Sequence, residues 1–170
     1  MIIRRIISVS ALLATVACAE SSAPLMPDLA SSSVRASDHR VVGAGHVQQP
    51  AGMREFTFHA LEHPDGSASG SFKVVLPNGL FFEADVTCLA VDGNTGWVGG
   101  VIRDTNAAVV VVGSVSTFYA IDNGEGADAP PDIVSTAAFN GAAGADLAFC
   151  AARPLVLAPF TVTEGNVEVW

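Results

Sequence analysis

The chain has 170 residues, of which 50% are hydrophobic and 15% are charged, a composition typical of a globular domain and not of a disordered chain. The formal net charge is −9, and without Arg4 and Arg5 of the expected N-terminal signal six basic residues face 17 acidic ones, or −11. Binding to a phosphate backbone needs stripes of lysine and arginine, and Lys73 is the only lysine, so the composition excludes nucleic acid as a partner.

Residues 1–19 have the layout of a bacterial export signal. Arg4 and Arg5 precede an uninterrupted apolar and small-residue run over 6–16, which is too short to span a bilayer as a helix. Residues 20–38 are rich in Ser, Ala and Pro and lack periodicity, which is typical of a flexible spacer. We expect a single β domain over 39–170 that works in the cell envelope or outside the cell.

Cys18 has two readings. The run Thr15-Val16-Ala17-Cys18 resembles the lipobox of bacterial lipoproteins, in which the cysteine is acylated and becomes the mature N-terminus. Thr15 departs from the leucine that is usual at its position. The alternative is ordinary signal cleavage after Ala19, because Ala17-Cys18-Ala19 also has small residues at the required positions. Lipidation at Cys18 would make the protein an envelope lipoprotein, and cleavage after Ala19 would make it a secreted protein.

From Arg40 onward the sequence shows short β-type runs separated by turn dipeptides. Asp65-Gly66, Asn78-Gly79 and Asp92-Gly93 each permit the positive φ values of tight hairpin turns. Apolar residues alternate with polar ones in the runs between these turns, which predicts one buried face. The expected inward set is Phe56, Phe58, Ala60, Phe72, Val74, Leu76, Phe82, Ala84, Val86 and Cys88, and Glu83 and Asp85 are expected to face solvent.

Further strands are expected over 97–102, 133–139 and 166–170, and residues 108–121 are long enough for one bent strand or for two. Gly96, Gly99 and Gly100 indicate a bulge or a close backbone approach. A short helix is expected near 143–152. The fold class is therefore all-β, an antiparallel meander of seven to nine strands closing into a barrel, because closure removes exposed sheet edges. A two-sheet β-sandwich is the alternative.

Two cysteines, Cys88 and Cys150, remain in the mature chain. In an oxidising compartment they are expected to pair with each other as a structural disulfide. A redox or metal pair is the alternative, but no CxxC spacing supports it.

The segment from His59 to His63 matches the H-x-x-E-H pattern of inverted zinc peptidases. That chemistry requires a helix, where both imidazoles share one face. Here the motif lies between a β-patterned run and the turn at Asp65-Gly66, and on a strand the two histidines would stand about 13 Å apart. We therefore expect two exposed strand-end histidines and no shared metal.

The loop 122–132 gathers four carboxylates, an asparagine and two glycines. The side-chain oxygens of these residues indicate a candidate Ca²⁺ site, although their spacing is not that of an EF-hand. The alternative is a solvated loop whose Asp and Asn side chains shape turns. The candidate Ca²⁺ ligands are Asp122, Asn123, Glu125 and Asp128.

Three aromatic residues, Trp97, Phe118 and Tyr119, are candidates for lining a ligand pocket in the barrel mouth. The alternative is that they are ordinary core residues.

Three segments carry a resemblance to other proteins: D-V-T-C-L at 85–89, G-N at 93–94 leading into W-V-G-G-V-I at 97–102, and D-N-G-E-G with A-P-P-D within 122–132. Together they resemble a set of small exported bacterial proteins with no assigned function, over about residues 43–169. The resemblance implies a β-rich secreted or lipid-anchored domain with a cysteine in the D-V-T-C run.

The favoured function is a non-enzymatic exported or lipid-anchored envelope module that binds a small ligand or a surface partner through one end of the barrel. One alternative is a hydrolase with an Asp/Glu site drawn from Glu83, Asp85 and the acidic loop, although the sequence contains no nucleophile elbow or Ser-His-Asp order. Another is a Ca²⁺-stabilised structural or adhesive surface component. No cofactor other than Ca²⁺ is expected, and the membrane is expected as a partner only through an N-terminal lipid.

Overall fold

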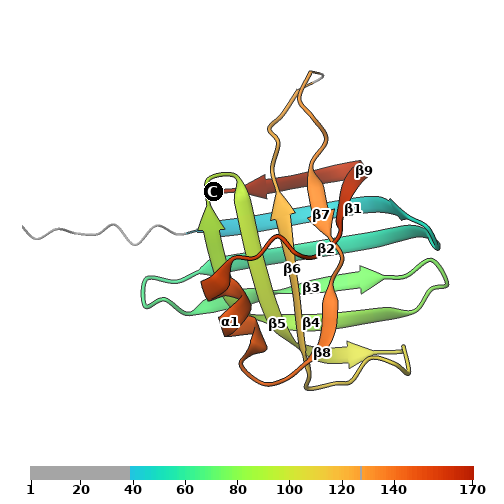
Figure 1. Ribbon diagram of the computed structural model, residues 1–170, viewed down its shortest axis with the longest axis vertical. Coiled ribbons are helices and arrows are strands. Elements are labelled where there is room, and N and C mark those ends of the chain that lie inside the picture. The colour runs from blue at the N-terminus through green and yellow to red at the C-terminus, as the bar shows by residue number, and fades with distance from the viewer. Residues whose placement is uncertain (1–38, 127) are drawn as a thin grey trace, which may run out of the picture. The chain divides into compact units, whose positions relative to one another are not determined.

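The computed structural model describes residues 39–126 and 128–170, so the expected signal, the spacer and Cys18 lie outside the described residues. The described chain is all-β with one short helix (Figure 1). In chain order the elements are β1 (Arg40–Gln49), β2 (Gly52–Glu62), β3 (Ala68–Val75), β4 (Phe81–Asp92), β5 (Thr95–Thr105), β6 (Val115–Ile121), β7 (Ile133–Ser135), β8 (Ala138–Gly141), α1 (Ala145–Ala152) and β9 (Pro159–Val169).

Eight of the strands form a closed antiparallel barrel. Strands β1 to β7 follow one another around the ring, and β9 closes it by pairing with β7 on one side and β1 on the other. Strand β8 is an extra strand paired with β6. The predicted all-β antiparallel barrel is confirmed. The sandwich alternative is wrong, because β5 pairs with both β4 and β6 and leaves the sheet no break between two layers.

The three predicted hairpin turns are confirmed. Asp65-Gly66 connects β2 to β3, Asn78-Gly79 connects β3 to β4, and Asp92-Gly93 connects β4 to β5. The glycine of each turn has a positive φ, of 81°, 78° and 58° respectively. Because glycine adopts such angles more readily than any other residue, these dipeptides set the register of the strands on either side.

The barrel interior is a cluster of aromatic rings and aliphatic side chains. Phe118 of β6 lies among the rings of the opposite wall, with centroid distances of 5.0 Å to Phe58 and 5.1 Å to Phe72. Glu83 and Asp85 lie on the outer face, as expected from the alternation. The predicted shared interior is confirmed for Phe58, Phe72, Phe82 and Val86.

The alternation predicted for β4 breaks at one point. Thr87 and Cys88 together stand opposite Gly99, because the pairing shifts between Val86 and Cys88. Such a bulge inserts one extra residue and reverses the facing of every residue after it. The placement of Cys88 on the inner face was therefore wrong: Cys88 turns outward toward α1, and Leu89 takes the inner face.

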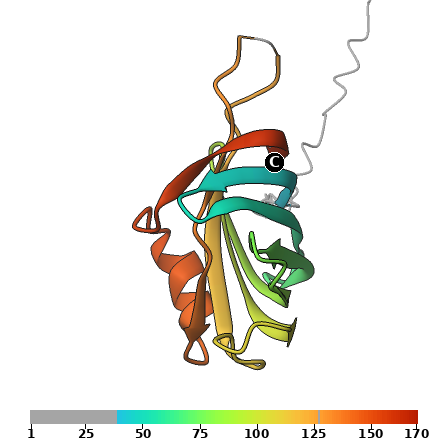
Figure 2. The ribbon, with the colours of Figure 1, turned by 90° about the vertical axis from the view of Figure 1, so that its right-hand side faces the viewer.

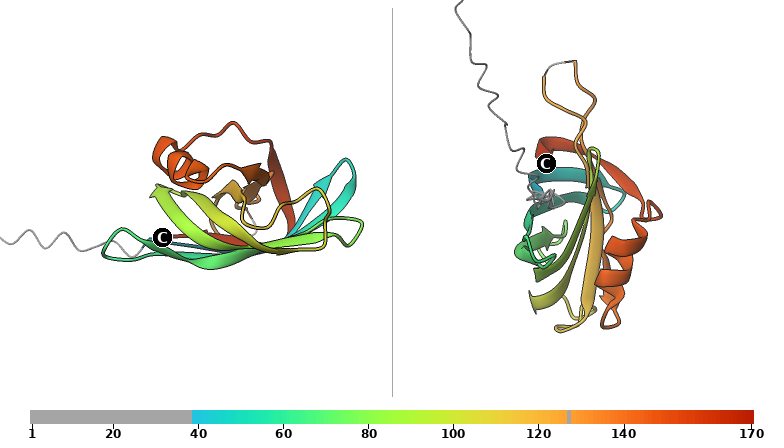
Figure 3. Two further views of the ribbon diagram at one scale, coloured as in Figure 1. Left: turned by 90° about the horizontal axis from the view of Figure 1, so that it is seen from below. Right: turned by 90° about the vertical axis from the view of Figure 1, so that its left-hand side faces the viewer.

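Helix α1 lies against the outside of the barrel wall formed by β4, β5 and β6 (Figures 2 and 3). It confirms the short helix expected near 143–152, and it buries Asp146 and Cys150 on one face. Within the described residues, no helix has the length and apolar character needed to cross a bilayer.

The second half of the barrel differs in detail from the sequence-based expectation. Only Val115–Ile121 of the stretch 108–121 is a strand. The residues before it form a loop, because Ala107 and Val110 pack into the core. The run 133–139 divides into β7 and part of β8, and β9 begins at Pro159, well before the predicted start at 166.

Candidate functional site

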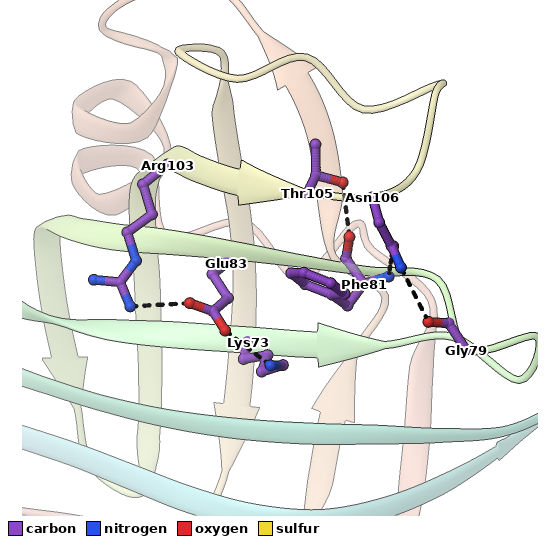
Figure 4. A network of polar contacts seen from close by, with 7 residues as sticks. All are labelled: Lys73, Gly79, Phe81, Glu83, Arg103, Thr105 and Asn106. Atoms are coloured by element: carbon purple, nitrogen blue, oxygen red, sulfur yellow. Dashed lines mark hydrogen bonds and ion pairs between the residues drawn. The ribbon is translucent and has the colours of Figure 1, made fainter.

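The carboxylates considered for a hydrolytic site lie on the outer face and are held by cations. Glu83 is bound by Lys73 at 2.8 Å and by Arg103 at 3.1 Å (Figure 4). Arg103 also binds Asp85 at 2.8 Å. Hydrogen bonds from Lys73 and Arg103 lower the pKa of Glu83. A general acid needs a raised pKa, so this geometry disfavours a general-acid role for Glu83.

The two histidines of the H-x-x-E-H pattern lie in extended chain. His59 is within β2, and its Nδ1 is 3.5 Å from the Ser71 hydroxyl. His63 follows β2, and its Nε2 is 2.7 Å from the Ser69 hydroxyl. The pattern therefore occurs on a strand, as predicted. Among residues 39–126 and 128–170 no three His, Cys, Asp or Glu side chains are grouped as metal ligands.

The acidic loop is fastened to β9 through aspartate side chains. Asp132 is buried, and its two oxygens accept backbone N–H groups of Asn123 at 2.9 Å and Val167 at 2.8 Å. Asp122 accepts the N–H groups of Gly124 at 2.8 Å and Val169 at 3.1 Å. These oxygens close turns and complete the hydrogen bonding of the strand, which supports the structural alternative for the loop.

The remaining Ca²⁺ candidates do not converge on Asp122. Glu125 accepts a hydrogen bond of 2.7 Å from the Asn166 side chain, and Asp128 is exposed. The Asn123 side chain donates to the carbonyl of Pro131 at 2.7 Å. The Ca²⁺ site stays a prediction. The structural role of Asp132 was not predicted from the sequence.

The three aromatic residues proposed for a pocket lie on both faces of the barrel wall. Trp97 and Tyr119 are paired across β5 and β6 on the outer face, where Trp97 Nε1 donates to the Pro154 carbonyl and Tyr119 Oη donates to the Leu157 carbonyl, each at 3.0 Å. Phe118 points into the interior. The structure therefore does not bring the three together, because adjacent residues of a strand face opposite ways.

Cys88 and Cys150 lie at disulfide distance, with Cα atoms 6.3 Å apart and a sequence separation of 62. This spacing is within the range that a disulfide spans. The bridge joins the bulge of β4 to α1, and the Thr87 hydroxyl beside it donates to the buried carboxylate of Asp146. The predicted pairing geometry is confirmed.

Arg54 is the one cation inside the barrel among the described residues. It occupies an inward position of β2, in line with Phe56 and Phe58, and is only 3% exposed. Its Nη2 donates to the Ser135 carbonyl at 3.0 Å, and its guanidinium carbon lies 5.7 Å from the centre of the Phe160 ring. Burial lowers the pKa of Arg54 to about 10, so the group is still charged at neutral pH.

Side chains fill the barrel interior. The cavity beside Arg54 has a volume of about 10 Å³ and is lined mainly by apolar side chains, among them Phe56, Phe58 and Phe118. Pockets for organic ligands are typically about 300–1,000 Å³. A ligand of that size therefore has no room inside this barrel.

The loop between β5 and β6, which lies at the lower edge of Figure 1, exposes several aliphatic side chains. Val109, Val111 and Val112 are 68%, 57% and 57% exposed, and Phe139 of the adjoining β8 is 44% exposed. Val111 N donates to Asn140 Oδ1 at 2.9 Å, and Asn140 Nδ2 donates to the Val109 carbonyl at 2.7 Å. We call these four apolar residues the valine loop patch.

Core contacts and hydrogen bonds anchor the loop that carries this patch. Ala107 and Val110 insert into the core on either side of the turn, and Gly113, at φ 88°, returns its N–H to the Ile102 carbonyl at 2.8 Å. Upstream, Asn106 binds the backbone of Phe81 at 2.6 Å (Figure 4). The exposed valines are therefore presented by an anchored loop.

Comparison with known proteins adds no relative. No family model matches the chain, no curated protein matches its sequence, and no solved structure gives a significant match. Function is therefore inferred from the residues of this chain.

Proposed function

We propose that the protein is a non-enzymatic exported or lipid-anchored module of the cell envelope that binds a protein partner through the valine loop patch. The observation that carries this proposal is the exposure of three valines on a loop anchored by Asn140, Ala107 and Val110, together with the exposed Phe139 of the adjoining β8. Exposed apolar side chains on an anchored loop are typical of interaction sites.

Two further observations favour a protein over the other ligand classes. The barrel interior has room for about 10 Å³ only, which favours a surface partner over an enclosed organic ligand. The excess of acidic residues, 17 Asp and Glu against 8 Lys and Arg, disfavours docking onto an anionic bilayer or a polyanion.

The test is photo-crosslinking in cells that produce the full chain. A photoreactive residue replaces Val111, and a control replaces Asp128, because the acidic loop projects from the opposite end of the barrel (Figures 1 and 2). We expect a discrete protein adduct from position 111 and none from position 128. A second variant, Val112→Asp, should leave the melting temperature unchanged because Val112 is exposed, yet reduce the adduct several-fold. Equal adducts from both positions, or an adduct insensitive to Val112→Asp, would contradict the proposal.

The export part has its own test. Cells fed a labelled fatty acid should yield labelled protein, and Cys18→Ser should remove the label. A mature N-terminus at Glu20 without lipid would establish the secreted alternative.

A further inference from the structure

A charge without a counter-charge is buried inside the barrel. The ion pairs of the described residues use Glu62, Glu83, Asp85, Asp92 and Glu164, and none of them includes Arg54. Arg54 Nε is also the sole buried side-chain nitrogen or oxygen that lacks a hydrogen-bond partner in the described part of the chain. Burying a cation in this way is unfavourable unless something neutralises it.

The hydrogen bond to Ser135 does not explain why a charged residue is buried at position 54. Ser135 is the last residue of β7, and its carbonyl accepts from Arg54 Nη2 at 3.0 Å. A neutral amide such as glutamine could donate to that carbonyl without the cost of desolvating a guanidinium. The Phe160 ring, 5.7 Å away, attracts the cation only weakly in comparison with an anion.

The space beside Arg54 limits what can neutralise it. The cavity of about 10 Å³ is lined by Arg54, Ser135 and mainly apolar side chains, including Val134 and Ala137. A space of about 10–15 Å³ is what one water molecule needs. A carboxylate ligand or a lipid is therefore too large, whereas one water fits, and a chloride ion, which is larger than water, fits only with a small outward shift of the lining side chains.

We propose that the barrel binds one chloride-sized anion in this cavity, with the Arg54 guanidinium as its counter-charge and its free Nε–H as a donor. The site is separate from the valine loop patch and does not depend on partner binding. An anion that binds only the folded state stabilises that state through mass action.

The test compares unfolding of the full-length protein in chloride and in gluconate at constant ionic strength and pH. Above the dissociation constant, each tenfold rise in chloride should raise the folded-to-unfolded ratio about tenfold, whereas gluconate is too large to do so. Arg54→Met should abolish this chloride dependence. Arg103→Met is the matched control, because Arg103 is an exposed arginine in ion pairs, and it should retain the dependence.

A direct measurement covers the case in which Arg54→Met does not fold. Crystals of the wild-type protein grown in bromide should show an anomalous peak within about 3.5 Å of Arg54 Nε. A site that holds water only, or a chloride dependence equal to that in gluconate, would overturn the proposal. Retention of the dependence by a folded Arg54→Met variant would also overturn it.

Discussion

Gly99 lies directly against Cys88, so that a Cβ atom placed on Gly99 would come within 2.7 Å of Cys88 Sγ and within 2.8 Å of Asp146 Cβ. No real Cβ tolerates such contacts. The absent side chain of Gly99 is thus what allows the bulge of β4 and helix α1 to approach closely enough for Cys88 and Cys150 to meet.

We predict that Gly99→Ala destabilises the protein and weakens closure of the disulfide. Overpacking at a tight contact typically costs about 1–3 kcal/mol. Urea unfolding should show this loss, and thiol titration of the air-oxidised protein should detect a reduced fraction of bridged chains. Gly141→Ala is the control, since its nearest contacts are 3.2 Å or longer and call for only a small adjustment. Equal losses in the two variants would argue against the contact at Gly99.

Removal of the bridge should cost more than either glycine change. The bridged cysteines are separated by 62 residues, and in the chain-entropy model a loop of that length contributes about 4 kcal/mol. The double variant Cys88→Ala with Cys150→Ala should unfold at lower denaturant than the oxidised wild type and at about the same denaturant as the reduced wild type. A variant as stable as the oxidised protein would show that the bridge does not form. Non-reduced peptide mapping should identify the linked peptide directly.

Asp132 should dominate the stability of the acidic loop. Its carboxylate accepts the N–H groups of Asn123 and Val167, so Asp132→Ala leaves two backbone donors without their partner. Each unsatisfied buried donor costs about 1–3 kcal/mol. Asp132→Asn keeps one acceptor and should lose less, and Asp128→Ala, at an exposed position, should lose nothing measurable in thermal unfolding.

The same loop allows a test of Ca²⁺. Because Asp122 and Asp132 already accept backbone N–H groups, we expect neither Ca²⁺ nor EDTA to shift the melting temperature. A rise with Ca²⁺ that disappears in Asp122→Asn would instead establish the site predicted from the sequence.

Tyr119 should make the protein sensitive to alkali. Burial raises the pKa of Tyr119, so above about pH 10 the unfolded chain loses the phenolic proton before the folded one does. The folded state then binds more protons, and the free energy of unfolding falls as pH rises through that window, by up to about 1.4 kcal/mol per pH unit. Tyr119 is the only tyrosine, so its absorbance as tyrosinate reports on it alone.

The control is Tyr119→Phe, which should lose the alkaline fall although it also loses the hydrogen bond to the Leu157 carbonyl. Arg54 raises the free energy of unfolding with pH over part of the same range. Its lowered pKa means that the unfolded chain binds more protons than the folded one there. Subtracting the variant's profile from that of the wild type removes this contribution. An ordinary tyrosine titration in the folded wild type would contradict the prediction.

The sequence predicted those parts of the fold that depend on neighbouring residues. The turns at Gly66, Gly79 and Gly93 fix adjacent strands, and the alternation around Phe58 and Phe72 assigns the inner face. Closure by β9 was not predicted, because pairing between strands at opposite ends of the chain leaves no local signal. The doubling of Thr87 and Cys88 was also missed: the glycines of β5 indicated a bulge but not the strand that carries it.

The inward position of Arg54 could have been predicted from the same alternation. Extending the alternation of Phe58 and Phe56 backward by two residues places Arg54 on the inner face, yet a charged residue normally marks the surface. The valine loop patch was not predicted, because its residues have the composition of a buried strand. Four successive valines have strong strand propensity, and only the insertion of Val110 into the barrel end makes that stretch a loop.

Among the strands of the described residues, β9 comes last in the sequence, yet it pairs with β1, which comes first. Arg40 and Trp170 exchange backbone hydrogen bonds of 3.0 and 2.9 Å. During synthesis, β1 therefore has one side unpaired until β9 has been made. A chain made one strand at a time cannot complete the ring before β9 is available. Over that interval the open edge of β1 is the part that a chaperone would have to shield.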